Sequence, residues 1–466
     1  MNLPLKSKVN SRIAEYNSKQ APPKKSILSF LYLRRKVLIL NLKFIRLQAT
    51  KKTVKLNIIN MDKKNLLSLT KKHLKTLCLD ISDRSVGSRG NRHATEYFKN
   101  ELMNNNWNIE ETLLNVMDWK TDGATLQCGQ THYEVLSSPY SLGCSTQGQL
   151  VSVSNIFELE NADLSDKIVL LHKEIAREQI MPKNFVFYNP EEHQRVISIL
   201  ENSDVKAIIC ATGHNPALAG GAYPFPMFED GDFNIPSVFM KDTEGEKLYN
   251  DRGKVVLLES KAERIPETAY NVTGRKSGIA KRRIVITAHI DAKKGTPGAI
   301  DNATGVTVML LLSEMLKDYY GKYPVELVAF NGEDYYAASG QMKYIEQNES
   351  NFSNIMLNIN IDGAGYKIGE SSFSLFELPD DIKSIVQKII KNNPAIKEGL
   401  PWYQGDHSIF LHYGCPSIAV SSGWFIENMD TQDITHTPKD NLEIVNYKRI
   451  YEIASAIYEI IDNLNK

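Results

Sequence analysis

The sequence predicts an α/β protein: a mixed, mostly parallel β-sheet flanked by helices, with a smaller β-rich domain inserted into it. Two observations predict this class. Residues 266–466 alternate short apolar runs with longer amphipathic runs, as expected for strands that alternate with covering helices. Residues 121–265 contain short β-like runs separated by Gly, Pro, Asn and Asp, which is typical of a β-rich domain. Hydrophobic residues make up 42% and charged residues 24% of the 466 positions, as in an ordinary globular protein.

The net charge of zero is a cancellation between two segments. Residues 1–60 hold 14 Lys and Arg and one acid, whereas residues 61–466 hold 41 basic and 54 acidic residues. Such an asymmetry indicates segments with different roles. We interpret residues 1–60 as a basic tail that is either a targeting segment or a spurious extension upstream of Met61, with nucleic-acid or membrane-surface binding as an alternative. Basic residues interrupt its apolar stretch Ile27–Leu47, so we expect no stable membrane insertion.

The cysteines favour a reducing compartment. There are five, widely spaced and without a CxxC pair, which argues against a disulfide framework and a Cys-based zinc site. We expect most of them to be small core residues. A cytoplasmic location is therefore expected, and a secreted or organellar one is the alternative if residues 1–60 are a targeting segment.

Residues 61–120 predict the first part of the α/β domain, as helix, turn, helix and strand. The first helix begins near Met61. The turn is Gly87–Asn91, and the helix after it places one apolar side toward the core. That side contains Ala94, Tyr97, Phe98, Leu102 and Met103.

The later segments supply the remaining strands and helices. In the insert, residues 121–265, the expected strands are 167–172, 206–212, 235–240 and 254–259. In the main part, residues 266–466, they are 283–288, 325–330, 356–361 and 416–420, with helices at about 304–318, 337–347, 379–391 and 442–464.

Polar side chains follow each strand of the main part. His289 and Asp291 follow the first strand, Glu333 and Asp334 the second, and Asp362 the third. Ligands of open α/β sheets bind beyond the carboxyl ends of strands, so these side chains are expected to face one crevice. Two further segments carry candidate ligands, 298–305 with Asp301 and 435–440 with His436.

These residues together predict a metal site. Two His and three carboxylates form a nitrogen and oxygen ligand set that suits zinc, and a two-metal hydrolytic site needs about this number. A further carboxylate is needed as the general base, and Glu333 fits because neighbours at a strand end point in different directions. Each motif alone is more often a turn, a helix cap or solvated surface; their conjunction predicts the site.

At these residues the chain resembles the di-zinc aminopeptidase family that includes bacterial leucyl aminopeptidase, aminopeptidase Y and glutamate carboxypeptidase. The resemblance covers roughly residues 263–466 and 65–115, and it implies the zinc-peptidase fold. The 121–265 insert resembles a protease-associated domain. The matching segments are His289–Asp291, Pro297–Val306, Asn331–Asp334, Ile361–Asp362, Gly405–Phe410, His436–Asp440 and Arg84–Ser88.

The resemblance also implies a role for each residue. Asp301 would bridge two zinc ions, with Co²⁺ or Mn²⁺ as alternatives. His289 and Asp362 would hold one ion, and Asp334 and His436 the other. Glu333 would be the general base, and Asp291 would orient the His289 imidazole. The peptide bond after Asp301 would be cis.

Some positions depart from the family pattern. Tyr336 replaces a usual Gly, and Thr435 stands where several members have an oxyanion-stabilising Tyr. Tyr403 and His407 are the candidate substitutes. Four aromatic residues are expected either to form walls for the first substrate side chain or to belong to the core: Trp402, Tyr403, Trp424 and Phe425.

The predicted function is that of a zinc-dependent metallopeptidase acting on peptides, most consistent with an aminopeptidase. A carboxypeptidase or dipeptidase of the same family is the alternative, and so is a non-catalytic receptor-like relative. Carboxypeptidases need Arg for the substrate carboxylate, and few Arg residues lie near the motifs, which favours amino-terminal cleavage. Neither a nucleic-acid partner nor a particular oligomeric state is predicted.

Overall fold

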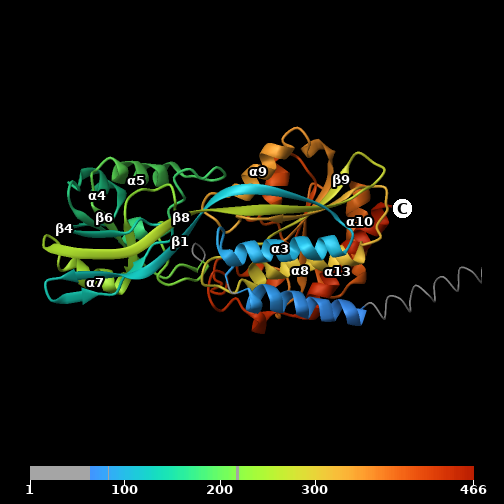
Figure 1. Cartoon of the computed structure of the whole chain (residues 1–466), viewed down its shortest axis with the longest axis horizontal. Helices are drawn as coiled ribbons and strands as arrows, with labels where there is room; N and C mark the ends of the chain where they lie inside the picture. The colour runs from blue at the N-terminus through green and yellow to red at the C-terminus, as the bar shows by residue number, and fades with distance from the viewer. Residues whose placement is uncertain (1–62, 82, 217–219) are drawn as a thin grey trace, which may run out of the picture. The chain divides into compact units, whose positions relative to one another are not determined.

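Figure 1 shows the protein as a computed structural model, which describes residues 63–81, 83–216 and 220–466. Contacts divide the chain into two units, Met1–Asn65 and Leu66–Lys466, and the second contains the sheet and the predicted site. The predicted basic tail, residues 1–60, lies outside the described residues. Within the described residues, no helix combines the length and the apolar character that a membrane span requires.

The first elements follow the predicted order with two differences. Residues 66–75 are helical and continue into a wider turn, η1 (Thr76–Asp80). Helix α3 (Arg89–Asn104) begins inside the segment predicted as a turn, because the Ser88 hydroxyl accepts the Asn91 N–H and caps it. Met103, expected in the core, is 54% exposed: it follows buried Leu102, and successive helical residues point about 100° apart.

A mixed, mostly parallel sheet forms the main part, as predicted. Its central strands are parallel neighbours in the order β10 (Val325–Phe330), β9 (Arg283–His289), β11 (Ile355–Ile361) and β14 (Ser417–Ser422). Antiparallel strands continue the sheet on both sides. They are β8 (Val255–Lys276) and then β1 (Asn108–Cys128) beside β10, and β12 (Ser371–Phe376) beside β14, with β13 (Ile396–Glu398) parallel to β12.

Helices cover both faces of this sheet, which is why its central strands are buried along almost their whole length. Ile284 and Ile286 pack in the largest core with helices on one face, and Val285 packs in a separate cluster on the other. The first face carries α3, α8 (Thr304–Met315), α10 (Asp380–Asn392) and α13 (Tyr447–Leu464) (Figure 1). The second carries α9 (Ser339–Asn348), η4 (Phe352–Asn354) and α11 (His407–His412).

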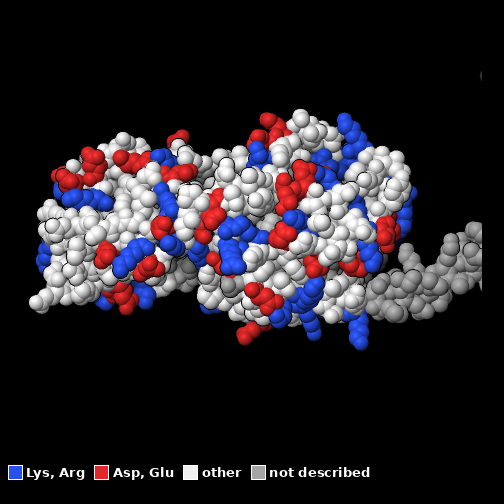
Figure 2. Space-filling model, in the orientation of Figure 1, with Lys and Arg blue, Asp and Glu red and all other residues white. Residues whose placement is uncertain are grey.

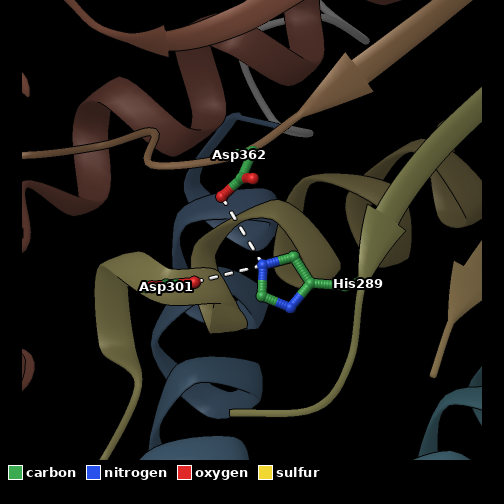
Figure 3. Close-up of side chains that lie close together, drawn as sticks. All are labelled: His289, Asp301 and Asp362. Carbon is green, nitrogen blue, oxygen red and sulfur yellow. Dashed lines mark ion pairs between the residues drawn. The ribbon is translucent and has the colours of Figure 1, made fainter. Parts of the chain in front are cut away.

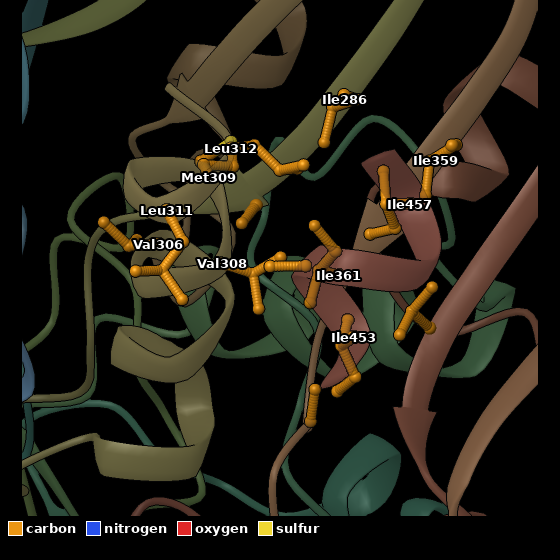
Figure 4. Packing of buried hydrophobic residues seen from close by; sticks show 14 of the residues in the cluster. Ile286, Val306, Val308, Met309, Leu311, Leu312, Ile359, Ile361, Ile453 and Ile457 are labelled. Atoms are coloured by element: carbon orange, nitrogen blue, oxygen red, sulfur yellow. The ribbon is translucent and has the colours of Figure 1, made fainter. Parts of the chain in front are cut away.

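Helix α8 is the central helix of the core. Every residue from Thr304 to Ser313 is buried, which is expected of a helix that is apolar on all sides. Figure 4 shows its Val306, Val308 and Met309 packed with strand and α13 isoleucines. Because Asp301 lies in the short turn that leads directly into α8, this packing helps to fix the position of a predicted metal ligand. The remaining short elements of the main part are η3 (Ala299–Ala303), α12 (Gly423–Glu427) and η5 (Leu442–Ile444).

The insert is an extension of two long strands. β1 and β8 pair along both parts, so the predicted boundaries at 121 and 265 fall within continuous strands, where Thr121 pairs with Ala262 and Asp118 with Ile265. Strand β4 (Cys144–Val153) pairs antiparallel with β8, and β5 (Ile168–His172), β6 (Ala207–Thr212) and β7 (Ser237–Lys241) then follow it as parallel neighbours. Short strands β2 (Thr131–Tyr133) and β3 (Leu136–Ser137) lie at its edges.

The insert contains helices that the β-rich prediction omitted. These are α4 (Ile156–Asn161), α5 (Glu191–Glu201), α7 (Asp242–Tyr249) and the 3-10 turn η2 (Lys173–Ala176). In α5 the buried residues are His193, Val196, Ile197 and Leu200. Their spacing is helical, so this helix was detectable from the sequence.

Among the described residues, the charged side chains of one face form no patch of one sign, and the cysteines form no disulfide. On the face of the described residues drawn in Figure 2, acidic and basic side chains are interspersed rather than separated into patches of one sign. All five cysteines are free thiols, and four of them are buried, which confirms the expectation of small core residues.

Candidate metal centre

The predicted ligands lie together at the carboxyl edge of the parallel sheet. His289 is the last residue of β9, and in the neighbouring strands it stands beside Phe330 of β10. Asp362 directly follows β11. Because these strands run in parallel, the residues that follow them emerge at one edge, which confirms the prediction of a shared crevice.

His289 and two carboxylates form the first ligand group. Nε2 of His289 lies 3.1 Å from Oδ1 of Asp301 and 3.6 Å from Oδ1 of Asp362 (Figure 3). The ring is fully buried. Burial alone would lower the pKa of His289, but the surrounding carboxylates, first Asp362, raise it well above its ordinary value. This position therefore strongly favours a positive charge.

Asp301 also belongs to the second ligand group. Its Oδ2 lies 3.2 Å from Nε2 of His436, and that nitrogen lies 2.9 Å from Oδ1 of Asp334. In each group the candidate ligand atoms lie within 4.8 Å of one another. Asp301 thus presents one oxygen to each histidine, as a bridging ligand would.

The chemistry of the two groups fits bound cations. Both ring nitrogens of His289 and Oδ2 of Asp334 are buried without a hydrogen-bond partner. Unpartnered buried polar atoms are costly, and carboxylates placed this close repel each other. Cations between them would offset both costs. Imidazole and carboxylate without thiolate is a donor set that zinc accepts.

Glu333 lies beside the ligand groups but outside them. It is partly exposed and lines a cavity of about 460 Å³ together with Asp334 and His436. Burial raises the pKa of Glu333 well above its ordinary value; the positive charge of His289 opposes this shift, and repulsion from Asp362 and Asp334 adds to it. The neighbouring carboxylates 333 and 334 therefore have different surroundings, as the sequence predicted.

A family comparison covers all of these residues. Residues 271–461 match the model of Peptidase family M28. This segment is therefore similar to M28 peptidases. The match excludes the insert, whose protease-associated character stays a prediction.

Some of the proteins with sequence or fold similarity to the chain are named aminopeptidases. Aminopeptidase YwaD of Bacillus subtilis (strain 168) is 25% identical over 261 residues, which are 52% of this chain and 55% of that protein. The chain thus matches about half the length of this curated relative. The fold resembles a solved aminopeptidase from Aneurinibacillus sp. strain AM-1, with a TM-score of 0.66 and 18% identity over 85% of this chain and 93% of the other.

A second solved structure gives the same result. BSAP, a zinc aminopeptidase from Bacillus subtilis, has a TM-score of 0.65 and 19% identity, covering 86% of this chain and 95% of the other. At such identities the likeness shows the fold alone, and it confirms the predicted zinc-peptidase fold class.

Within the segment that matches the M28 model, Asp291 holds the loop that carries Glu333 and Asp334. Its Oδ1 accepts the backbone N–H groups of Gly332 at 2.8 Å and Glu333 at 3.3 Å, and its Oδ2 accepts that of Asp334 at 3.0 Å. The distance from its Oδ1 to Nδ1 of His289 is 3.7 Å, longer than a hydrogen bond. The implied role of orienting His289 stays a prediction, and positioning of the 332–334 loop is the role that the contacts support.

Asp291→Asn should therefore reduce turnover without removing the ligand residues. An Asn side chain offers one acceptor oxygen instead of two, so at least one buried N–H of the loop loses its partner, at about 1–3 kcal/mol. We expect a 10- to 100-fold lower kcat, measured together with metal content and Tm. A variant with wild-type kcat would show that the loop does not depend on these bonds.

Two charged residues missed as site residues hold the turn that carries Asp301. Asp440 is fully buried and accepts the N–H of Ile300 at 2.7 Å and of Asp301 at 3.0 Å. The guanidinium of Arg84, also buried, donates to the carbonyls of Pro297 and Gly298. Both lay in family-like segments of the sequence, but no local pattern shows which backbone groups a distant charge will contact.

The turn itself is irregular. Asp301 and Asn302 have non-helical dihedral angles, and the peptide bond between them is cis, as the resemblance implied. Asn302 accepts the N–H of Gly305 and donates to the carbonyl of Ile361. It thereby joins the start of α8 to the end of β11, the two elements that flank the first ligand group.

The structure does not support His407 as an oxyanion donor. Its ring is fully buried, with Nε2 2.8 Å from the carbonyl oxygen of Trp402, and burial lowers its pKa to about 4. Tyr403 is 66% exposed and packs against Phe376. Neither residue is among the described residues that line the cavity.

Of the four aromatic residues considered as substrate walls, some pack in hydrophobic clusters and one is largely exposed. Phe425 belongs to the main core, and Trp424 packs against it. Trp402 packs in a small cluster with Phe376 and Ala419. The core interpretation is thus confirmed for Phe425, and Tyr403 is the most exposed of the four.

Proposed function

We propose that the protein is a metal-dependent aminopeptidase that releases amino-terminal residues from peptides. The observation that carries this proposal is the pair of ligand groups that share Asp301, with the free carboxylate of Glu333 beside them. The proposal is further supported by the M28 match and by similar proteins that are named aminopeptidases.

The proposed site would hold two divalent cations, Zn²⁺ first and Co²⁺ or Mn²⁺ as alternatives. His289 and Asp362 would bind one, Asp334 and His436 the other, and Asp301 both. Such cations lower the pKa of water toward neutrality and polarise a carbonyl group.

Glu333 would carry out the proton transfers. It accepts the proton of the attacking water and then donates that proton to the amine that leaves. A general base works best when its pKa lies near the working pH, and the buried surroundings of Glu333 shift its pKa in that direction. Asp291 would keep its backbone in place.

The cavity favours amino-terminal over carboxyl-terminal cleavage. No arginine occurs among the described residues that line it. Its lysines are already paired, Lys293 with Glu229 at 2.8 Å and Lys294 with Asp118 at 2.7 Å. A free cation is what a carboxypeptidase needs for the substrate carboxylate. The carboxypeptidase, the dipeptidase and the receptor-like relative remain the alternatives to test.

Metal removal tests the proposal. Dialysis against a strong chelator should reduce hydrolysis of leucine p-nitroanilide to background, because the ligand groups then hold no cation. Addition of Zn²⁺ should restore the hydrolysis, and the holoprotein should melt at a higher temperature than the apoprotein. The matched substrate control is N-acetyl-leucine p-nitroanilide, which lacks the free amine and should not be cleaved. Activity that resists chelation, or cleavage of the acetylated substrate, would reject a metal-dependent aminopeptidase.

A further inference from the structure

The cavity beside the metal centre is lined both by residues of the main α/β part and by residues of the insert. At one end it is lined by Glu333, Asp334 and His436. Most of its remaining wall comes from the insert and is apolar or aromatic. The insert's part of that wall includes Tyr140, Ile180, Pro182, Phe185 and Phe239, and Trp119 of β1, just before the insert in the sequence, lies beside it. A volume of about 460 Å³ lies within the usual range for small-ligand pockets, roughly 300–1,000 Å³.

The insert touches the loops that carry the site residues. A Cβ atom on Gly220 would lie 2.6 Å from the carbonyl oxygen of Thr435 and 2.8 Å from Nδ1 of His436. A Cβ atom on Gly231 would lie 2.4 Å from the hydroxyl of Tyr336. Only glycine permits such close approach. The insert wall is therefore held at a fixed distance from His436 and from the Glu333 loop.

Tyr336, which replaces a usual Gly of the family, is part of this contact. Its ring packs against Tyr140 of the insert, with centroids 4.9 Å apart, and against Tyr335 at 4.6 Å. Tyr335 accepts the backbone N–H of Met117 in β1 at 2.7 Å. Tyr335 and Tyr336 thus connect the loop after Glu333 to β1 and to the turn of the insert that carries Tyr140.

The charges in the cavity wall compensate each other. Glu229 of the insert pairs with Lys293, and it also accepts a hydrogen bond from Gln179. Lys294 pairs with Asp118 and lies 5.0 Å from the centroid of the Trp119 ring. Away from Glu333 and Asp334, a charged substrate side chain would lose its water here without finding a free partner. An uncharged, apolar side chain would bury its surface against the aromatic wall.

The position of Glu333 indicates which part of a substrate enters. In the proposed reaction Glu333 donates a proton to the leaving amine, so that amine lies within hydrogen-bond reach of it. Glu333 lines the cavity together with many residues of the insert, whereas His289 and Asp362 are not among its described lining residues. The chain that follows the leaving amine is therefore directed into the cavity.

We propose that the insert forms the binding site for the second residue of the substrate, the one that follows the cleaved bond, and that this site selects a large apolar side chain. The inference rests on the proposed aminopeptidase activity. It assigns the insert a direct part in substrate selection, with Phe185 as a specificity-determining residue in contact with the second side chain.

Phe185→Ala tests the inference, with Phe187→Ala as the matched control. The two rings lie on one loop 5.8 Å apart, but only Phe185 lines the cavity. The measurement is kcat/KM of the zinc-loaded full chain for the dipeptides Leu-Phe, Leu-Ala and Leu-Asp. We expect wild type to prefer Leu-Phe and to disfavour Leu-Asp. The preference for Leu-Phe over Leu-Ala should fall about tenfold in Phe185→Ala and less than twofold in Phe187→Ala.

A second pair of substrates separates the two positions. Selectivity for the first residue, measured as Leu-Ala against Ala-Ala, should change less than twofold in Phe185→Ala. A change at the first position, or an unchanged Leu-Phe preference, would overturn the inference while wild-type cleavage upholds the aminopeptidase. A wild type that cleaves none of the dipeptides would overturn both. If Phe185→Ala has a lowered Tm, Phe185→Leu, which keeps an apolar side chain, should give an intermediate preference.

Discussion

Glu333→Gln should abolish turnover while the protein keeps its metal. Gln has nearly the same shape as Glu but cannot accept the proton of the attacking water, and general acid–base catalysis contributes about 10²- to 10⁴-fold. Glu333 belongs to neither ligand group, so metal content should stay near that of wild type. Burial disfavours the charge of Glu333, and the neutral amide should not weaken the fold.

The measurement is kcat on leucine p-nitroanilide with metal content determined on the same sample. We expect at least a 10³-fold loss in kcat. Glu346→Gln is the matched control, because Glu346 is an exposed carboxylate paired with Lys343 on α9 and should give wild-type activity. Full activity in Glu333→Gln would remove the base assignment, and loss of metal would instead place Glu333 among the ligands.

Much of the main part was predictable because its determinants are local. A strand buried on both faces is a continuous apolar run, and Arg283–His289 and Val325–Phe330 were found on that basis. The site followed from the same argument, since parallel strands deliver the residues after them to one edge. Asp301 and His436 do not directly follow a strand; they were candidates as ligand-type residues in the segments 298–305 and 435–440, and the family resemblance supplied their roles.

The contacts that support the site could not be predicted in the same way. Arg84 lies more than 200 positions from the carbonyls of Pro297 and Gly298 that it binds. Gly220 and Gly231 look like ordinary turn glycines in the sequence, and only the fold shows that they permit contact with His436 and Tyr336. Such contacts depend on where a whole domain is placed, and residue spacing carries no information about that.

A contact that only the fold reveals also argues against His407 as an oxyanion donor. His407 lies in a segment that resembles the family, and it was a candidate donor because Thr435 stands where several members have a Tyr. Its Nε2 lies at hydrogen-bond distance from the carbonyl of Trp402, a contact within the fold that occupies one of its two ring nitrogens. Its other nitrogen, Nδ1, is buried without a partner. A residue type can thus suit a reaction while its hydrogen-bond partners exclude it.

Asp301→Ala should remove metal and activity together. Asp301 is the one residue common to both ligand groups, so its loss leaves each proposed cation with two protein ligands instead of three. The turn does not depend on the Asp301 carboxylate, because Asp440 accepts hydrogen bonds from the backbone N–H groups of residues 300 and 301. An alanine at position 301 would keep its backbone N–H. The variant should therefore fold with the turn in place and fail to retain either cation.

Comparison with single-group variants makes the test specific. Asp362→Ala and Asp334→Ala each remove a ligand from one group only, so each should retain about half of the wild-type metal after dialysis, whereas Asp301→Ala should retain almost none. Activity on leucine p-nitroanilide should fall at least 10³-fold in Asp301→Ala, since it loses both the cations and the polarisation that they supply. Equal metal loss in all three variants would mean that the two groups bind cooperatively without a bridge. A metal-replete, active Asp301→Ala would exclude the bridging role, and the shared position of its two oxygens between His289 and His436 would then need another explanation.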